Sequence, residues 1–117
     1  GRTRIMEKYR VIISPKLIEQ IKSIRDYVAN VKLSPETAER LVTAIFDEIE
    51  SLELFPERGF DADEKIGVKI NKNGRSSRGI TIQNGKYIVI YTVNQEEHIV
   101  EVAFLFSSKT DYAKLFR

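Results

Sequence analysis

The chain has 117 residues, of which 42% are hydrophobic and 31% are charged, and its formal net charge is +2. This size and apolar content are typical of one folded domain and argue against a disordered chain. Cysteine is absent and His98 is the single histidine, which excludes disulfides, thiolate chemistry and multi-histidine metal sites, so we predict neither a metal nor a cofactor. No apolar run approaches the roughly 18 residues of a membrane helix, and no signal-peptide pattern occurs. We therefore expect a cytoplasmic protein with no membrane partner.

The chain begins before its only methionine, Met6. We interpret residues 1–5 as a vector-derived remnant and residues 6–117 as a single domain. Without Arg2 and Arg4 the net charge falls from +2 to zero, so overall basicity carries no functional argument.

The charge is instead divided along the chain. Residues 36–64 hold ten acidic and two basic side chains, whereas residues 65–95 hold six basic and no acidic ones. This asymmetry indicates either a polyanionic or acidic partner, or two solvated faces of opposite sign.

The N-terminal half carries one strand pattern followed by two helix patterns. Residues 8–14 are rich in β-branched and aromatic residues, which predicts a strand. Ser14-Pro15 and Ser34-Pro35 each place a capping serine before a proline, which is typical of a helix start. After each start, apolar residues recur every three or four positions and predict two helices joined as an antiparallel hairpin. The two expected buried stripes are Leu17, Ile18, Ile21, Ile24, Tyr27, Val28 and Val31, and then Ala38, Leu41, Val42, Ile45, Phe46, Ile49 and Leu52.

The C-terminal half changes from a helical period to a period of two. The segment 55–59 contains a proline and a glycine, which end the second helix. Asn84-Gly85 is a strong signal for a two-residue hairpin turn. The strands expected around it are residues 67–70, 79–83, 86–93 and 99–106.

These elements predict the fold class α+β, in the order β-α-α-β-β-β with a short C-terminal helical turn over residues 112–116. The helical hairpin is expected to pack on one face of a mainly antiparallel sheet and to leave the other face free. Alternation along the last strand assigns its side chains to two faces. Val100, Val102, Phe104 and Phe106 are expected on one face, and Ala103 and Leu105 on the other.

Basic and aromatic side chains near the ends of the predicted strands are the candidate binding residues. They are Lys69, Lys72, Arg75 and Arg78 around a glycine-containing turn, and Lys109 and Tyr112 after the last strand. If these segments converge, the side chains suit the binding of phosphates and bases or the docking of an acidic peptide. The alternative interpretation is that they keep an edge strand soluble.

The other titratable residues form no catalytic pattern. Asp61, Asp63 and Glu64 lack the spacing of a calcium loop, so we predict a solvated acidic loop without metal. His98 stands at a turn beside glutamates, which favours a surface histidine over a general base.

Short motifs follow one another along nearly all of residues 8–116. They are Tyr9-Arg10-Val11-Ile12-Ile13-Ser14-Pro15, Ile21-x-x-Ile24-x-x-Tyr27, Ser34-Pro35-x-x-Ala38, Ile49-x-x-Leu52-x-x-Phe55-Pro56-x-x-Gly59, Gly85-Lys86-Tyr87-Ile88-Val89-Ile90-Tyr91 and Val100-x-Val102-x-Phe104-x-Phe106. In this order the chain resembles the RelE/ParE superfamily of bacterial type II toxin–antitoxin toxins. The resemblance implies a small toxin, of a plasmid-stabilisation type of module, held inactive by a cognate antitoxin whose C-terminal segment wraps around it.

The superfamily has two branches with different targets. RelE-like members cleave messenger RNA on the ribosome, and ParE-like members poison DNA gyrase. RelE-like members place an arginine where this chain has Ile88, and lysines where it has Gly79 and Thr81. The helical hairpin is more similar to that of the ParE-like branch. The resemblance therefore favours a gyrase inhibitor, and we assign no catalytic residue.

Two alternatives stay open, and with them the question of whether the chain is an enzyme. One is a diverged RelE-like ribosome-dependent mRNA endoribonuclease that uses Arg75, Arg78, Lys109 and Tyr112. The other is a non-toxic member that only binds its antitoxin. In each case we expect the antitoxin over the apolar groove between helices and sheet, with its acidic residues near the basic strand region. The expected assembly is a homodimer or a toxin–antitoxin heterocomplex.

Overall fold

A computed structural model describes residues 8–71 and 74–116, apart from the side chains of Tyr112 and Ala113. The interpretation of residues 1–5 as a remnant falls outside this part of the chain. None of the described helices is long and apolar enough to cross a membrane. The elements in chain order are β1 (Arg10–Ile13), α1 (Pro15–Asp26), a π-helical turn (Tyr27–Val31), α2 (Pro35–Glu50), a 3₁₀ turn (Ser51–Glu53), β2 (Phe60–Asp61), α3 (Ala62–Ile66), β3 (Ser77–Ile82), β4 (Tyr87–Asn94), β5 (Ile99–Ser107) and a 3₁₀ turn (Tyr112–Leu115).

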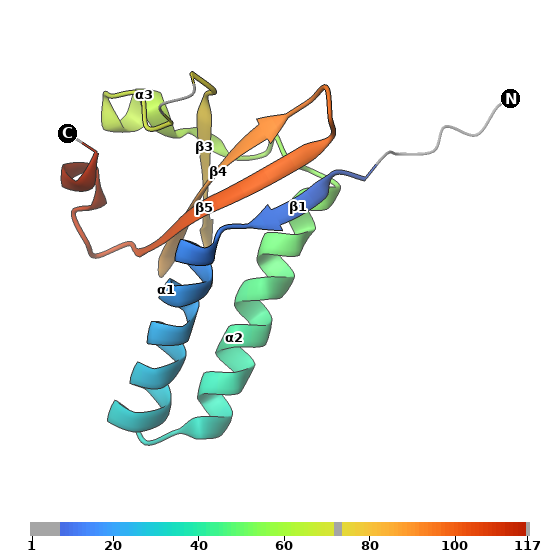
Figure 1. Ribbon diagram of the computed structural model, residues 1–117. Helices are drawn as coiled ribbons and strands as arrows, with labels where there is room; N and C mark the ends of the chain where they lie inside the picture. The colour runs from blue at the N-terminus through green and yellow to red at the C-terminus, as the bar shows by residue number, and fades with distance from the viewer. Residues whose placement is uncertain (1–7, 72–73, 117) are drawn as a thin grey trace, which may run out of the picture.

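The five strands form one sheet in the order β1-β5-β4-β3-β2. β1 runs parallel to β5, and the other neighbours are antiparallel. The turn at Asn84-Gly85 joins β3 to β4, with the backbone N–H of Lys86 donating to the carbonyl of Gln83 at 3.2 Å. Figure 1 shows α1 and α2 side by side as an antiparallel hairpin below this sheet. The predicted α+β class and the mainly antiparallel sheet are therefore confirmed.

The expected strand at residues 67–70 is wrong, and a short helix precedes that segment instead. The Asp61 carboxylate caps α3 by accepting the backbone N–H of Glu64 at 3.0 Å. Gly67 then ends the helix in the left-handed region, with φ +88°. The following loop is held by Asp63, whose carboxylate accepts the N–H of Ile70 at 2.9 Å. Local capping chemistry thus overrides the weak strand pattern.

Ser14 joins the start of α1 to the middle of the sheet. Its hydroxyl oxygen accepts the N–H of Leu17 at 3.1 Å, as expected of a helix cap, and its O–H donates to the carbonyl of Ala103 at 2.8 Å. Ser34, at the start of α2, makes no such backbone cap and donates only to the exposed Thr37 hydroxyl at 2.6 Å. The two Ser-Pro starts are therefore alike in sequence but different in contacts.

Ser14→Ala is expected to lower the free energy of unfolding by about 2 kcal/mol, because one substitution removes a cap and a part-buried hydrogen bond. Ser34→Ala is the matched control and should cost less than about 0.5 kcal/mol. Urea unfolding of both variants measures the difference. Equal losses at the two positions would show that Ser14 has no special role in joining α1 to β5.

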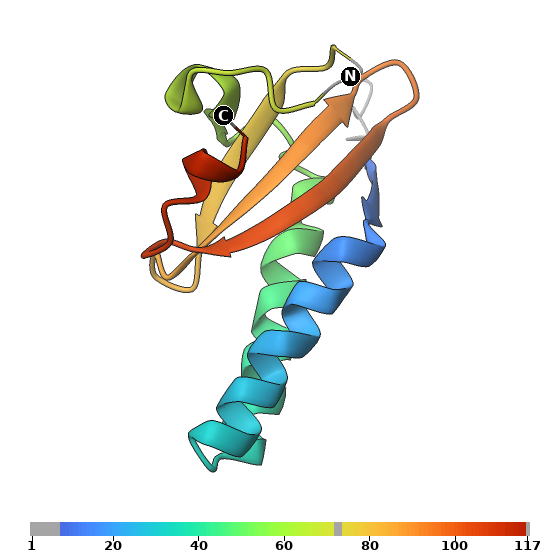
Figure 2. The ribbon, with the colours of Figure 1, turned by 60° about the vertical axis from the view of Figure 1, so that its left-hand side comes forward.

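The far end of the helical hairpin extends beyond the sheet (Figures 1 and 2). Leu17 and Ile21 of α1 are buried against the sheet, but Tyr27 is 52% exposed and Val31 63% exposed. The expectation that both of the latter belong to the buried stripe is wrong, because this end of the hairpin extends beyond the sheet. The buried stripe of α2 is confirmed at Ala38, Ile45, Ile49 and Leu52.

A bulge in β5 changes the face on which its side chains lie. Ile90 pairs with Phe104 and Tyr91 pairs with Val102, so Ala103 is an extra residue between the two pairs. Val102 and Leu105 consequently share the core on the helix side of the sheet. The expectation that Leu105 faces away from Val100 and Val102, with Phe104 and Phe106 beside them, is therefore wrong.

The sheet face opposite the hairpin is not free, contrary to expectation. A second apolar cluster there is centred on Ala62, Ile88 and Ile90, with Phe104 and Phe106 packed against them. The ring of Phe116 meets the Phe104 ring edge-on, with centroids 5.3 Å apart. Figure 2 shows α3 and the C-terminal turn together on this side of the sheet. Side chains of the chain itself therefore cover part of this face.

Candidate functional site

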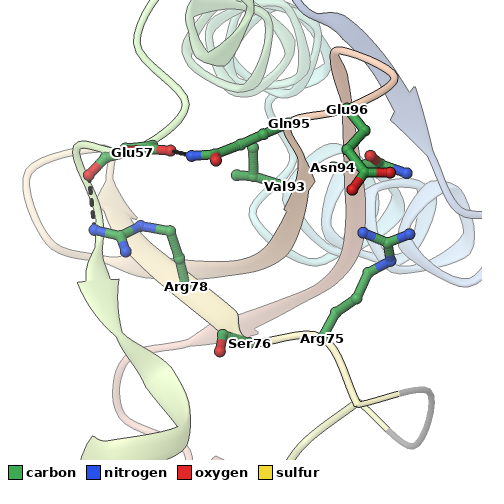
Figure 3. A pocket seen from close by; sticks show the side chains of 8 residues that line it. All are labelled: Glu57, Arg75, Ser76, Arg78, Val93, Asn94, Gln95 and Glu96. Carbon is green, nitrogen blue, oxygen red and sulfur yellow. Dashed lines mark hydrogen bonds between the residues drawn. The ribbon is translucent and has the colours of Figure 1, made fainter.

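A polar hollow of about 460 Å³ lies where β3 begins and β4 ends, and we call it the arginine hollow (Figure 3). Its lining residues are Glu57, Arg75, Ser76, Arg78, Val93, Asn94, Gln95 and Glu96. Figure 3 shows the two guanidinium groups pointing to different parts of its rim, Arg78 toward Glu57 and Arg75 toward Asn94 and Glu96. The structure thus brings together two of the predicted basic residues.

Arg78 is engaged with the chain itself. Its Nη2 donates to the carbonyl of Glu57 at 2.7 Å and to that of Gly59 at 2.5 Å. These bonds fasten the loop before β2 to the start of β3. A guanidinium held in this way has fewer donors left for a ligand, so Arg78 acts first as a structural clamp.

Tyr91 lies beneath this clamp and pairs across the strands with Arg78. Its side chain is completely buried. Neither the Tyr91 hydroxyl nor Arg78 Nε has a hydrogen-bond partner of ordinary geometry among the described residues. Burial raises the pKa of Tyr91, and the nearby Gly59 backbone and Arg78 guanidinium offset only part of this rise. Tyr91 is therefore uncharged at neutral pH and is not a general base there.

Lys69 also has an internal partner. Its Nζ lies 3.7 Å from an Asp63 carboxylate oxygen and 3.5 Å from the Ser76 hydroxyl. Asp63 additionally accepts the N–H of Ser77 at 3.0 Å, so it organises the loop between α3 and β3. The prediction of a merely solvated acidic loop is wrong for Asp63. Lys72 lies outside the described residues.

Lys109 lies at the other end of the sheet from Arg78. β3 and β5 both run antiparallel to β4, so the start of β3 and the end of β5 are at opposite ends. Lys109 follows β5 and lines a separate hollow of about 420 Å³, the lysine hollow, together with Lys32 and Lys86. The expected convergence of Arg78 with Lys109 is wrong, and the side chain of Tyr112 falls outside the described part. A binding role for each of these residues stays a prediction.

A third hollow, of about 640 Å³, lies between the helical hairpin and the β3–β4 turn, and we call it the hairpin hollow. Val28, Leu41 and Ala44 supply aliphatic side chains, and Lys32, Arg40 and Lys86 supply positive charge. Tyr87 lines both this hollow and the lysine hollow, and partial burial raises its pKa. The sequence analysis did not select Lys32, Arg40, Lys86 or Tyr87 as binding residues. The position of Lys86 directly after the Asn84-Gly85 turn was the usable signal, because that turn must lie at one end of the sheet.

Comparisons with known proteins agree with this geometry. Among solved structures, a chromosomal ParDE toxin–antitoxin system from P. aeruginosa is similar at a TM-score of 0.64 and 15% identity, covering 87% of this chain and 96% of that one. An archaeal RelE–RelB complex from Pyrococcus horikoshii gives a TM-score of 0.50 at 20% identity, covering 86% and 96%. A RelBE toxin–antitoxin complex from Mycobacterium tuberculosis gives 0.53 at 17% identity, covering 90% and 97%. At these identities the likeness concerns the fold.

Sequence comparison gives the family. A search of curated proteins found no match. The family profile described as the ParE toxin of the type II toxin–antitoxin system parDE matches residues 11–112, which is most of the chain and includes both long helices and all of the sheet except the first residue of β1. The chain therefore belongs to the ParE family of type II toxin–antitoxin toxins, within the RelE/ParE superfamily that its motifs resemble.

Proposed function

We propose that this toxin inhibits growth by binding DNA gyrase, and that it acts without hydrolysing RNA. Membership of the ParE family supports a toxin of this branch. The observation that carries the proposal is the separation of the ribonuclease candidates: Arg75 and Arg78 line one hollow, and Lys109 lines another at the opposite end of the strands.

Metal-free cleavage of RNA needs an acid, a base and cations arranged around a single phosphate. The arginine hollow holds two carboxylates, Glu57 and Glu96, beside its guanidinium groups, and Arg78 already donates to two backbone carbonyls. Lys109 is too far along the sheet to complete the set there. Action by binding needs no such convergence, so it fits the arrangement better.

We further propose that a cognate antitoxin neutralises the toxin by docking in the hairpin hollow, which gives a toxin–antitoxin heterocomplex. The solved relatives described above are themselves toxin–antitoxin systems or complexes. The hollow offers aliphatic side chains from the π-helical turn and from α2, and a positive rim from Lys32, Arg40 and Lys86. An amphipathic segment with acidic residues matches both features.

The test measures gyrase and RNA in parallel. Purified toxin added to a supercoiling reaction is expected to inhibit gyrase in proportion to its concentration. Primer-extension mapping of messenger RNA after induction is expected to show no new ribosome-dependent cuts. Lys109→Gln is expected to leave gyrase inhibition intact. The same variant tests the ribonuclease alternative, which requires Lys109 for cleavage.

Two outcomes contradict the proposal in different ways. Unchanged supercoiling with ribosome-dependent cuts that disappear in Lys109→Gln supports the RelE-like alternative. Unchanged supercoiling, unchanged RNA and normal growth after induction support a member that only binds its antitoxin.

A further inference from the structure

The lysine hollow collects positive charge from three separate parts of the chain. Lys32 follows the π-helical turn, Lys86 precedes β4, and Lys109 follows β5. β4 and β5 are antiparallel neighbours with Tyr87 opposite Ser107, so the start of one and the end of the other meet. The N–H of Ser108 donates to the carbonyl of Lys86 at 2.9 Å and fixes this junction. The fold itself therefore places the lysines around one volume.

Among the residues that the structure describes, no carboxylate lines the lysine hollow. Within the described part of the chain, neither Lys86 nor Lys109 makes an ion pair, and Lys32 only approaches the Tyr27 ring, at 5.9 Å. Lys8, Lys69 and Lys114, by contrast, each lie within 4.0 Å of an acidic oxygen. Ammonium groups that lie near one another without a carboxylate partner repel one another. A bound anion lowers the electrostatic energy of this repulsion.

Besides the lysines, the hollow is lined by Asn84, Gly85, Tyr87, Ser107 and Ser108, and the two serines offer hydroxyl donors. The Ser107 hydroxyl oxygen accepts the N–H of Lys109 at 3.3 Å, which leaves its O–H to donate elsewhere. The Ser108 side chain is exposed, and the Tyr87 ring forms one wall. Ammonium and hydroxyl donors of this kind match the oxygens of a phosphate group. The volume of about 420 Å³ lies within the range of about 300 to 1,000 Å³ that is usual for ligand sites.

From this arrangement we propose that the lysine hollow binds the phosphodiester backbone of a nucleic acid, with Lys32, Lys86 and Lys109 as the phosphate contacts. Tyr87 offers a ring on which a base can stack. Lys32, Lys86 and Tyr87 also line the neighbouring hairpin hollow.

An acidic protein segment is the competing occupant, and the lining disfavours it. None of the described residues that line the lysine hollow has an aliphatic side chain, so an amphipathic helix would find no apolar surface on them. A phosphodiester needs only charge, donors and an aromatic face, all of which are present. The inference goes beyond inhibition of gyrase and does not depend on it, since binding is measured without that enzyme.

The experiment is a fluorescence-anisotropy titration with a fluorescein-labelled single strand of about 20 thymidines, and with a duplex of the same length. The intact toxin is expected to bind both, and binding should weaken steeply between about 50 and 200 mM salt. In Lys86→Gln/Lys109→Gln the affinity at low salt should fall about tenfold, and the slope of log K against log salt should become shallower by about 0.7 per lost contact on the single strand. Circular dichroism confirms that the variant is folded.

The matched control is Lys16→Gln/Lys22→Gln, which removes the same charge from exposed lysines of α1 that line none of the described hollows. Its affinity and salt slope should stay close to those of the unchanged protein. If both double variants lose the same affinity for the oligonucleotides, binding depends only on the net charge of the protein. That result would contradict a specific site in the lysine hollow. Binding of poly-glutamate through Lys86 and Lys109, with no binding of either oligonucleotide, would overturn it in favour of an acidic protein partner.

Discussion

Gly59→Ala is expected to lower the free energy of unfolding by about 3 kcal/mol, which corresponds to a fall of roughly 10 °C in melting temperature. A Cβ atom at this position would lie 2.4 Å from the carbonyl oxygen of Gly79 and 2.6 Å from the Tyr91 hydroxyl oxygen. The first neighbour is backbone of a paired strand, and the second belongs to a completely buried ring. Neither group can move without disturbing the sheet. The steric overlap therefore cannot be relieved by a small local shift.

Gly67→Ala provides the matched control, because the same methyl group is added in open space. Gly67 has φ +88°, and no atom of the described residues lies within 4 Å of an added Cβ. Its substitution should therefore cost only the strain of a left-handed alanine, about 1 kcal/mol. Thermal and urea unfolding of both variants separate steric overlap from backbone strain.

Tyr91→Phe tests the cause of the Gly59 effect. The single variant should be close to neutral in stability, because it removes a buried hydroxyl that has no hydrogen-bond partner of ordinary geometry among the described residues. Combined with Gly59→Ala, it should recover part of the lost stability, since the 2.6 Å contact disappears while the contact with Gly79 remains. Strictly additive effects would mean that the hydroxyl takes no part in the overlap.

The sequence predicted elements well where local chemistry decides them. Ser14-Pro15 starts α1, and Asn84-Gly85 turns β3 into β4, because capping and turn geometry depend on neighbouring residues only. The burial of Tyr27 and Val31 could not be predicted in this way. Their helical spacing continues the apolar stripe of α1. Only the length of the sheet determines where residues of that stripe become exposed to solvent.

The faces of β5 illustrate a different limit. The alternation of Val100, Val102, Phe104 and Phe106 runs through the bulge without interruption, since every second residue is apolar. Ala103 is small and apolar, so nothing in the pattern marks it as the extra residue. The carbonyl of this extra residue accepts the Ser14 hydroxyl, which is a tertiary contact that the alternation of side chains cannot reveal.

The expected convergence of Arg78 with Lys109 was wrong for a reason that the predicted topology already contained. Arg78 stands at the start of β3 and Lys109 after the end of β5, and two strands that flank a common antiparallel neighbour point the same way. Their separation could have been inferred by following strand direction. The grouping of Lys109 with Lys86 could have been inferred by the same step, whereas the contribution of Lys32 depends on how the hairpin packs against the sheet.

Arg78→Met is expected to lower the free energy of unfolding by about 2 kcal/mol. Methionine keeps much of the unbranched apolar stem and removes the guanidinium, so the variant isolates the two hydrogen bonds to the carbonyls of Glu57 and Gly59. Charge-assisted bonds of this kind are worth more than neutral ones, and water replaces them only in part because the Gly59 contact is half-buried. The measurement is urea unfolding, followed by the supercoiling assay at a temperature where the variant is folded.

Arg75→Met separates the clamp from the charge of the arginine hollow. Arg75 is exposed at the rim of the same hollow, so its replacement removes one positive charge without opening the loop before β2. Its stability should change by less than about 0.5 kcal/mol. If Arg78 serves as a clamp, folded Arg78→Met inhibits gyrase as well as Arg75→Met does. Full stability combined with lost inhibition in Arg78→Met alone would instead make Arg78 a contact with the target, and the loop carbonyls would then be incidental acceptors of its guanidinium.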